Sequence, residues 1–453
     1  MRTIPFCVSM LVLAAPAFAG KVWVVGPLPA PHQDLQDAII AAQDGDIILV
    51  RHGTYESVRT VGRSVTIVAE NGATVQLPGA VRVADFPASK TLVLSGLRAA
   101  AGSSTSVPQV AHGLHIRTCP GQVIAQDCTF TSSLNWSTYG TGVVDVRDCG
   151  GLALVRCGIV GATPGVTNNS SGIAVGPGAH VSLEQISAQG AAGRNGFPPP
   201  TGVFDYADGC AGSPGLYYSA LANEASSFVF ASNSQFQGGV GGYATWGAQL
   251  CTFCGYAGSG GDGIFGANPA SPLILLGVTA IGAPGGAGPV GCPGGLICGT
   301  GSAGPPGQAI YAGHPLVNRG CIFSGTTSSV TPYTNLSGAP RTLAGPRLVR
   351  DDTRPTFQFQ GSPSEFVELG IARHPLFQPA TGAGGVLHVF ANEWRRVGVV
   401  STTGTLSTRF KLPDLPVTDP GATLFLQARF IDPTSGAIRL SNLHVVVLLD
   451  ASY

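Results

Sequence analysis

The segment VIAQDCTF, residues 123–130, has an apolar residue at 123 and 125, skips two residues, and then has a cysteine at 128 and an apolar residue at 130. Its pattern is U-x-U-x-x-U-x-U, where U is apolar or cysteine. Alternation with a period of two is typical of a strand with one buried face. The step of two residues breaks that alternation, as a bend would. These eight residues therefore predict two short strands joined at a corner.

The same pattern recurs along the chain at a nearly constant interval. It fits LVLSGLRA (92–99), VIAQDCTF (123–130), LALVRCGI (152–159), VSLEQISA (181–188) and LILLGVTA (273–280). The first four begin at 92, 123, 152 and 181, in steps of 31, 29 and 29 residues. FVFASNSQF at 228 fits with one extra residue, and HPLVNRGCIF at 314 fits loosely. A period of about 30 residues in a strand-rich sequence predicts a solenoid, whose coils bury their apolar sides against one another.

A second alignment supports the same repeat. GLHIRTC (113–119) and GVVDVRDC (142–149) align at their cysteines, which are 30 residues apart. This alignment predicts that His115 stacks on Asp145, Arg117 on Arg147, and Cys119 on Cys149 in adjacent coils. The first four of these side chains would then share the outward face of two neighbouring strands.

The start of the chain has the features of a secretory signal peptide. Arg2 precedes the apolar stretch IPFCVSMLVLAAPAFA (4–19), and Ala17-Phe18-Ala19 fits the small-x-small cleavage rule. We therefore expect a signal peptide over residues 1–19 and a secreted or cell-surface protein. An uncleaved anchor is the alternative. After cleavage no further segment is long and apolar enough to predict a membrane span.

Export would make disulfides permissible, because ten of the 11 cysteines remain after residue 19. The candidate pairs are Cys119 with Cys149, Cys128 with Cys157, and Cys292 with Cys298. For the two pairs in adjacent coils, an unbonded stack of small buried thiols is the alternative. The CTFC segment at 251–254 lacks a second cysteine pair, so no metal site is predicted.

The N-terminal region carries a family resemblance. HQDLQDAIIAAQDGD (32–46) predicts a helix that covers the open end of the solenoid, with Asp34 near its start. From residue 35 the sequence LQDAIIAAQDGDIILVRHGTY, followed by RSVTIVAENGATV, resembles the opening of secreted right-handed parallel β-helix proteins of the pectin-lyase-like superfamily. The matching positions are Leu35-Gln36, Ala38-Ile39, Ala42, Gly45-Asp46, Ile48, Val50, Gly53 and Tyr55. The resemblance implies an all-β, right-handed parallel β-helix with an N-terminal capping helix.

The sequence changes in character after about residue 340. Longer alternating segments such as TFQFQ, EFVELGIA and TLFLQARFID follow one another without cysteine, which predicts a small β-sandwich. LFLQARFIDPTSGAIRLSN (424–442) resembles a C-terminal module of secreted bacterial proteins of uncharacterised function. We expect a β-helix domain over 20–335 and a sandwich-like domain over 336–453. The Gly/Pro-rich stretches 190–215 and 282–307 predict long surface loops.

Candidate functional residues follow from the chemistry of the superfamily, whose enzymes mostly act on acidic polysaccharides. A lyase needs a group that neutralises a uronate carboxylate, often Ca²⁺, together with a base, and a hydrolase needs two carboxylates. The catalytic candidates are Arg117, Asp145, Arg147, Asp205 and Asp208. The candidates for substrate binding are His115, Trp136, Tyr139 and Tyr206. The alternatives are a solvated face with offsetting charges, an Asx-rich loop bonded to its own backbone, and aromatics that anchor their own loops.

Two functions remain open from the sequence. We expect an exported, non-catalytic β-helix protein that acts as a cell-surface or extracellular binding or structural module, plausibly for carbohydrate. The alternative is a polysaccharide lyase or glycoside hydrolase acting on acidic polysaccharide, which would bring Ca²⁺ as a cofactor. The module requires none. With 24 basic and 24 acidic residues the chain has no electrostatic footprint for nucleic acid, and its oligomeric state has no signature.

Overall fold

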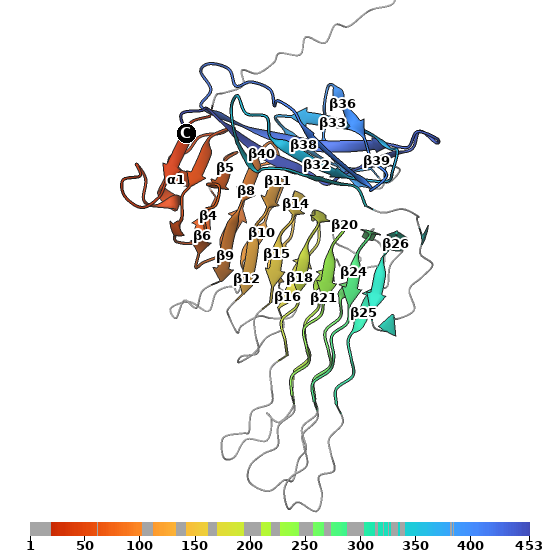
Figure 1. The fold of residues 1–453 in the computed structure, drawn as a ribbon. Helices are drawn as coiled ribbons and strands as arrows, with labels where there is room; N and C mark the ends of the chain where they lie inside the picture. Colours follow the sequence, from red (N-terminus) through yellow and green to blue (C-terminus); the bar gives the residue numbers. More distant parts are fainter. Residues whose placement is uncertain are drawn as a thin grey trace, which may run out of the picture.

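The computed structural model describes residues 20–60, 62–101, 112–132, 142–161, 170–193, 210–218, 227–243, 257–266, 273–287, 303–312, 316–319, 321–324, 326–327, 334–335, 340–380, 383 and 385–453. Three long parallel sheets wind around one apolar core to form a right-handed parallel β-helix (Figure 1). This confirms the predicted fold class. No helix in the described part of the chain has the length and apolar character needed to cross a bilayer.

The three sheets, here called A, B and C, follow one another in every coil. Sheet A contains β1 (Val22–Val25), β2 (Ile47–Val50), β5 (Thr66–Ala69), β8 (Thr91–Ser95), β11 (Cys119–Gln126), β14 (Cys149–Val155), β17 (His180–Glu184), β20 (Phe228–Ser232), β23 (Leu273–Leu276), β26 (Leu316–Arg319) and β29 (Thr334–Asn335). Sheet B contains β3 (Gly53–Thr54), β6 (Val75–Leu77), β9 (Leu97–Ala101), β12 (Thr129–Ser132), β15 (Gly158–Val160), β18 (Ser187–Gln189), β21 (Gln235–Gln237), β24 (Thr279–Ile281) and β27 (Ile322–Ser324). Sheet C contains β4 (Val58–Arg59), β7 (Val81–Ala84), β10 (Leu114–Arg117), β13 (Gly142–Val146), β16 (Ser171–Val175), β19 (Leu216–Tyr218), β22 (Ile264–Gly266), β25 (Gln308–Ala312) and β28 (Thr326–Thr327).

The repeat pattern predicts the register of the coils correctly. Leu92 pairs with Val123, Val123 with Leu152, and Leu152 with Val181, as the sequence alignment requires. The residue before the second strand of the pattern adopts a positive φ in successive coils. These corner residues are Gly96, Asp127, Arg156, Gln185, Asn233 and Gly277. The left-handed corner turns the chain from sheet A into sheet B, and it explains why the alternation is interrupted there.

The two cysteine pairs in adjacent coils stack as predicted but are free thiols. Cys119 pairs in register with Cys149, and all four cysteines of the two pairs are buried and unbonded. Cys128 Sγ donates to the carbonyl of Gln126, and Cys157 Sγ donates to the carbonyl of Val155, each at 3.4 Å. All four thiols are unbonded, so the structure shows the stack of buried thiols and not the predicted disulfides for these two pairs. Cys292 and Cys298 lie outside the described residues.

A short helix covers the open end of the solenoid. It is α1 (Leu35–Ala41), and the Asp34 carboxylate accepts hydrogen bonds from the backbone N–H groups of Gln36 and Asp37 at its N-terminus. The apolar face of the helix is buried in the solenoid core, as its sequence predicts. Asp46 follows the helix and is itself buried. Its carboxylate accepts from the backbone N–H groups of Lys21 and Gln43 and from Trp23 Nε1, so it ties the first strand to the cap.

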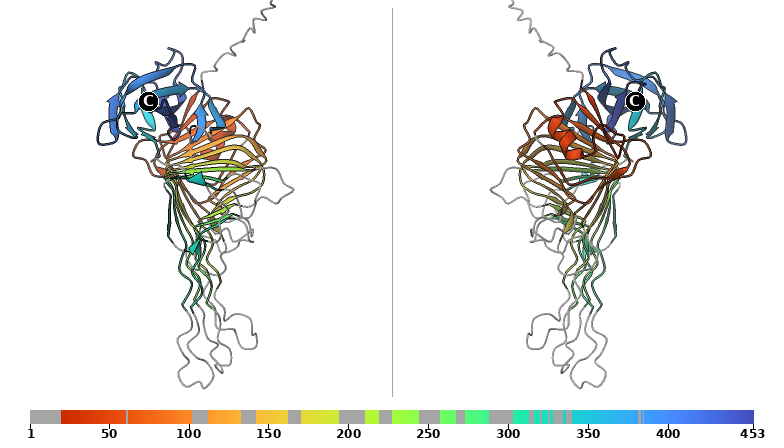
Figure 2. Two further views of the ribbon diagram at one scale, coloured as in Figure 1. Left: turned by 90° about the vertical axis from the view of Figure 1, so that its right-hand side faces the viewer. Right: turned by 90° about the vertical axis from the view of Figure 1, so that its left-hand side faces the viewer.

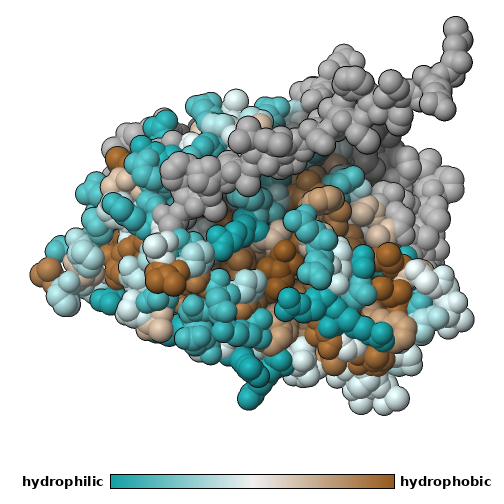
Figure 3. All heavy atoms as spheres, turned by 90° about the horizontal axis from the view of Figure 1, so that it is seen from above, coloured by the Kyte–Doolittle hydropathy of each residue, from teal (hydrophilic) through white to brown (hydrophobic). Residues whose placement is uncertain are grey.

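The C-terminal strands form a two-sheet sandwich. One sheet contains β30 (Thr342–Ala344), β32 (Thr356–Gln360) and β37 (Thr405–Arg409). The other contains β31 (Leu348–Arg350), β40 (His444–Leu449), β38 (Gly421–Ile431), β33 (Phe366–Ala372) and β36 (Trp394–Val399), with β39 (Ile438–Leu440) paired to β38. β34 (Pro375–Ala380) and β35 (Gly385–Val389) form a separate hairpin. Seen from above, the surface on the sandwich side mixes hydrophilic and hydrophobic residues (Figure 3).

The sandwich packs on the outer face of sheet A, so β40 is buried on both of its faces. Val446 and Leu448 point into the sandwich core. Val445 packs against Ile124 and neighbouring apolar residues of sheet A, while Val447 joins the cluster formed by β2 and β5. Burial on both sides explains why the β40 sequence HVVVLL is a continuous apolar run and not an alternating one.

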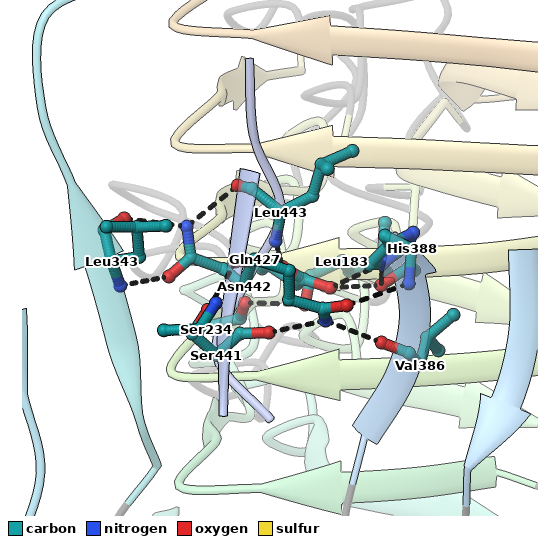
Figure 4. A network of polar contacts seen from close by, with 12 residues as sticks. Leu183, Ser234, Leu343, Val386, His388, Gln427, Ser441, Asn442 and Leu443 are labelled. Atoms are coloured by element: carbon teal, nitrogen blue, oxygen red, sulfur yellow. Dashed lines mark hydrogen bonds and ion pairs between the residues drawn. The ribbon is translucent and has the colours of Figure 1, made fainter. Parts of the chain in front are cut away.

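Buried polar groups also connect sheet A to the C-terminal sandwich and its hairpin. We call this interface the joint. Glu184 of sheet A accepts from the backbone N–H of Leu443 at 2.8 Å and contacts His388 Nε2 at 2.9 Å. The side chain of Gln427 donates to the carbonyls of Val386 and Ser441, which ties the hairpin to the sandwich (Figure 4). The joint is therefore both apolar and hydrogen-bonded, and its geometry is specific.

The glycine-rich stretches are not simple loops, because their described parts form an ordered bundle. Extended segments run side by side away from the solenoid (Figures 1 and 2). We call them the glycine bundle, and they are residues 190–193, 210–215, 238–242, 257–263, 282–287 and 303–307. One ladder of backbone hydrogen bonds crosses all six: Ser213 N to Ala191 O, Gly239 N to Ser213 O, Gly261 N to Gly239 O, Ala283 N to Gly261 O, and Gly307 N to Ala283 O.

Further backbone hydrogen bonds join bundle segments that run in the same direction. Along each pair of segments, one such bond follows another after three residues. Gly238 N donates to the carbonyl of Ile281, and Gly241 N donates to that of Pro284. Three residues per turn is the period of a polyproline II helix, which has no internal hydrogen bonds. A Cβ on Gly212 would lie 1.8 Å from the carbonyl oxygen of Gly239, so only glycine fits there. The abundance of glycine is therefore a packing requirement of this bundle.

Replacing Gln126 by alanine should destabilise the joint. Its amide exchanges two hydrogen bonds with the backbone of Val445, at 2.9 and 2.7 Å. The variant leaves a buried N–H and a buried C=O unpaired, so we expect the free energy of unfolding in urea to fall by about 2–5 kcal/mol. Gln76→Ala, on the exposed face of sheet B, is the matched control and should change it by less than about 0.5 kcal/mol. Equal effects of the two variants would contradict the role given to Gln126.

Replacing Gly239 by alanine should open the glycine bundle. The added Cβ would lie 1.9 Å from the carbonyl oxygen of Ala191, so the neighbouring segments must separate. We expect faster amide hydrogen exchange at Gly239 and Gly261. Gly158→Ala is the control, since a Cβ there meets no atom nearer than 3.9 Å. Unchanged exchange in Gly239→Ala would show that the bundle does not depend on this contact.

Acid should weaken the fold through His444 in the joint. Burial, together with the Arg156 guanidinium, lowers the pKa of His444 from 6.5 to about 3. The unfolded chain therefore binds a proton that the folded chain does not, and stability is lost as the pH falls from about 6.5 towards 3. This group contributes a slope of up to about 1.4 kcal/mol per pH unit. In His444→Gln the slope of unfolding free energy against pH should be shallower, whatever the variant's absolute stability. An unchanged slope would refute the assignment.

Candidate functional site

Two neighbouring strands of sheet C bring four of the predicted site residues together. β10 and β13 pair in parallel with His115 opposite Asp145, and the same register places Arg117 opposite Arg147. The carboxylate of Asp145 is the centre of the group. Its Oδ2 lies 3.3 Å from Arg117 Nη2, and its Oδ1 lies 3.5 Å from Arg147 Nε. The predicted stacking of these residues is confirmed.

The interpretation of this face as a solvated surface with offsetting charges is wrong for Asp145. Its side chain is fully buried, whereas that of Arg117 is 46% exposed. The two guanidinium groups and the ring of His115 surround the carboxylate, and a carboxylate withdrawn from water needs such charged partners. The arginines therefore cover the acid, and the surface that meets solvent is basic.

His112 is a member of this group that the sequence analysis did not identify. Its Nε2 lies 3.5 Å from Asp145 Oδ2, and its Nδ1 contacts the carbonyl oxygen of Gly142. The rings of His112 and His115 stack with centroids 4.9 Å apart and an interplanar angle of 15°. In a regular strand, residues three apart point to opposite faces. His112 precedes β10, and the backbone at Gly113 brings both rings to the same side.

Both histidines of this group are held in their neutral form. Burial, the neighbouring His112 and the Arg117 and Arg82 guanidiniums lower the pKa of His115 to about 4, although Asp145 opposes the shift. Burial also lowers the pKa of His112, against the effects of Asp145 and of the Gly142 carbonyl. The group at neutral pH is therefore one carboxylate, two neutral imidazoles and the arginines.

The outward row of side chains that contains Asp145 continues along sheet C with Tyr217, Phe265 and Tyr311, which we call the aromatic ladder. The register from β7 to β25 aligns Arg82, His115, Asp145, Ala174, Tyr217, Phe265 and Tyr311. The rings of Tyr217 and Phe265 stack with centroids 5.4 Å apart, and those of Phe265 and Tyr311 with centroids 4.9 Å apart. One face of the solenoid thus has a basic half and an aromatic half, with Ala174 between them.

A second polar cluster has the residue types of a nucleophilic triad, but its geometry is structural. Ser182 Oγ and Glu184 Oε1 both contact Nε2 of His388, at 3.3 and 2.9 Å. A triad needs the serine and the carboxylate on different ring nitrogens, so that one orients the ring while the other exchanges a proton. All three side chains are also buried in the joint. This cluster therefore holds the sandwich on sheet A.

Several predicted site residues lie outside the described residues. They are Asp205, Asp208, Trp136, Tyr139 and Tyr206. The structure places none of them, so their assignment as catalytic or substrate-binding candidates stays a prediction.

The comparisons with known proteins leave the function open. No protein-family model matches the chain, and no curated protein matches it. Among solved structures it is similar to the "Siphovirus 9NA tailspike receptor binding domain", with 10% sequence identity over 90% of this chain and 96% of that chain, at a TM-score of 0.16. A score this low supports no argument about function, so any function must be argued from the geometry of sheet C.

Proposed function

We propose that this protein is an exported, non-catalytic β-helix module that binds an anionic carbohydrate on the outer face of sheet C. The observation that carries the proposal is the pair of arginines, Arg117 and Arg147, which share the buried carboxylate of Asp145. The apolar, signal-like start of the chain supports export.

The charge balance of this face favours an anionic ligand. With both histidines neutral, the outward charged residues are Arg59, Arg82, Arg117 and Arg147 against Asp145, an excess of three positive charges. Two acidic residues, Asp85 and Asp148, follow these strands at the exposed corner towards sheet A, so the excess is confined to the strand face. Guanidinium groups bind carboxylates and sulfates through paired, charge-assisted hydrogen bonds. The chain as a whole has few charges, at 11% of its residues.

The shape of the face favours an extended ligand. The rungs of a parallel sheet repeat at about 4.8 Å, so a chain lying along the solenoid axis meets an equivalent position on each strand. Beyond the arginines, such a chain would pass over Ala174 and reach the hydroxyl groups and ring edges of the aromatic ladder. Aromatic side chains with a polar end suit sugars, because the ring can contact the apolar C–H groups while the polar end bonds to a hydroxyl group.

The same residues argue against hydrolysis. A glycoside hydrolase uses two carboxylates, one of them as a general acid. On the described strands of sheet C the outward face carries one carboxylate, and both of its oxygens already contact arginines. Binding without cleavage is therefore the simpler use of this site.

A lyase is the second candidate, and one observation favours it. A neutral imidazole, that of His115, lies beside the Arg117 guanidinium through their shared contact with Asp145. In uronate elimination an arginine can neutralise the substrate carboxylate while a neutral base removes the adjacent proton. Binding and elimination would use the same face, and the products distinguish them.

The test is a binding screen of residues 20–453 against acidic and neutral polysaccharides, with release of unsaturated uronate recorded in parallel. We expect binding to an acidic polysaccharide without elimination. Arg117→Ala should weaken it about 10- to 100-fold, because charge-assisted hydrogen bonds contribute about 1.5–3 kcal/mol.

Arg98→Ala is the matched control, since Arg98 is an exposed arginine on sheet B of the same coil. It should leave the affinity unchanged. Equal losses in the two variants, or binding to neutral polysaccharides alone, would refute the proposal. Unsaturated products that disappear in His115→Gln would establish the lyase instead.

A further inference from the structure

We infer that His112, His115 and Asp145 form a three-ligand site for a divalent transition metal, with zinc as the appropriate probe. The three side chains come from two adjacent coils, and one ligand atom of each lies within 4.8 Å of the others. The site shares the Asp145 carboxylate with the glycan proposal, but it depends on the imidazoles of His112 and His115, which glycan binding by the arginines does not require.

The first argument is the tautomer of His112. Its Nδ1 contacts the carbonyl oxygen of Gly142, which only accepts hydrogen bonds, so Nδ1 must carry the proton. In the neutral ring Nε2 then has a lone pair, and this lone pair faces Asp145 Oδ2. Metal-binding histidines characteristically donate their other ring N–H to a carbonyl or carboxylate, which fixes the ring and its tautomer. The Gly142 carbonyl has that position here.

The second argument is the environment of His115. Its Nε2 is buried and has no hydrogen-bond partner in the described part of the chain. A buried polar nitrogen without a partner is costly, and it needs a specific explanation. This atom faces the same carboxylate oxygen, Asp145 Oδ2, as His112 does. Three side chains that can ligate a metal thus converge, and a cation between them would give the His115 nitrogen the partner that it lacks.

The third argument is the spacing of the ligand atoms. Asp145 Oδ2 lies 3.5 Å from His112 Nε2 and 3.8 Å from His115 Nε2. Both distances are too long for good N–H···O hydrogen bonds, which are about 2.7–3.2 Å. Metal–ligand bonds of about 2.0–2.2 Å place two tetrahedral ligands about 3.3–3.6 Å apart. The first observed distance lies in that range and the second is slightly longer.

The ligand types indicate the class of metal. Two imidazoles and one carboxylate suit zinc and its divalent transition-metal neighbours, whereas Ca²⁺ prefers oxygen ligands alone. Three protein ligands leave one coordination position for a water or an anion. Since Arg117 and Arg147 contact the same carboxylate, the loaded site carries an excess of positive charge and favours an anion in that position. Two neutral imidazoles that only pack beside Asp145 are the competing account of the cluster.

The test is a zinc titration of purified residues 20–453 after treatment with a chelator, with a chromophoric chelator as competitor. We expect a site that His112→Gln and His115→Gln each weaken at least 100-fold, while circular dichroism shows that both variants remain folded. His52→Gln changes an exposed histidine outside the cluster and should bind zinc like the wild type. Cobalt should give a visible spectrum of nitrogen and oxygen ligands without sulfur charge-transfer bands, which excludes the cysteines.

One variant separates this inference from the proposed function. Arg117→Ala removes a cation beside the metal, so zinc affinity should stay equal or rise while glycan affinity falls. Failure of glycan binding with normal zinc binding would refute only the proposed function. Zinc affinity that is the same in His112→Gln, His115→Gln and the wild type, or a cobalt spectrum with sulfur ligands, would overturn the metal site and leave the imidazoles as packing partners of Asp145.

Discussion

The in-register stacking of parallel strands is the constraint on which the rest of this structure depends. Each coil must place its inward side chains directly over those of the previous one, because a shift of one residue would turn every apolar side chain outwards. The same register aligns the outward side chains, so His115 lies over Asp145 and Tyr217 over Phe265. The candidate site and the aromatic ladder are therefore consequences of the core packing.

The glycine bundle extends this stacking beyond the solenoid by other means. In the coils, side chains fill the space between neighbouring strands. In the bundle, carbonyl oxygens approach so closely that no Cβ fits, as at Gly212 and Gly239. Backbone hydrogen bonds between segments then replace the apolar core as the source of order. A glycine-rich sequence without apolar periodicity can thus form a defined structure when neighbouring coils supply equivalent segments.

The sequence predicted the structure where its pattern is periodic and not where burial depends on distant residues. It predicted the coil register, the capping helix from Asp34 and the stacking of Cys119 on Cys149. It indicated loops for the glycine-rich stretches, because a period made of backbone contacts leaves no apolar signature. It also did not indicate His112, since the bend at Gly113 cannot be inferred from alternation alone.

The repeat, the cap and the continuous apolar run of β40 are properties of the sequence by itself, because each follows from local periodicity and from which side chains avoid water. The tertiary structure decided that Asp145 is buried beneath two arginines and that its carboxylate meets two histidine nitrogens. It also decided that the thiols stay unbonded. These features depend on distances and angles between groups on different coils, and spacing along a chain specifies which groups are neighbours but not how their atoms face one another.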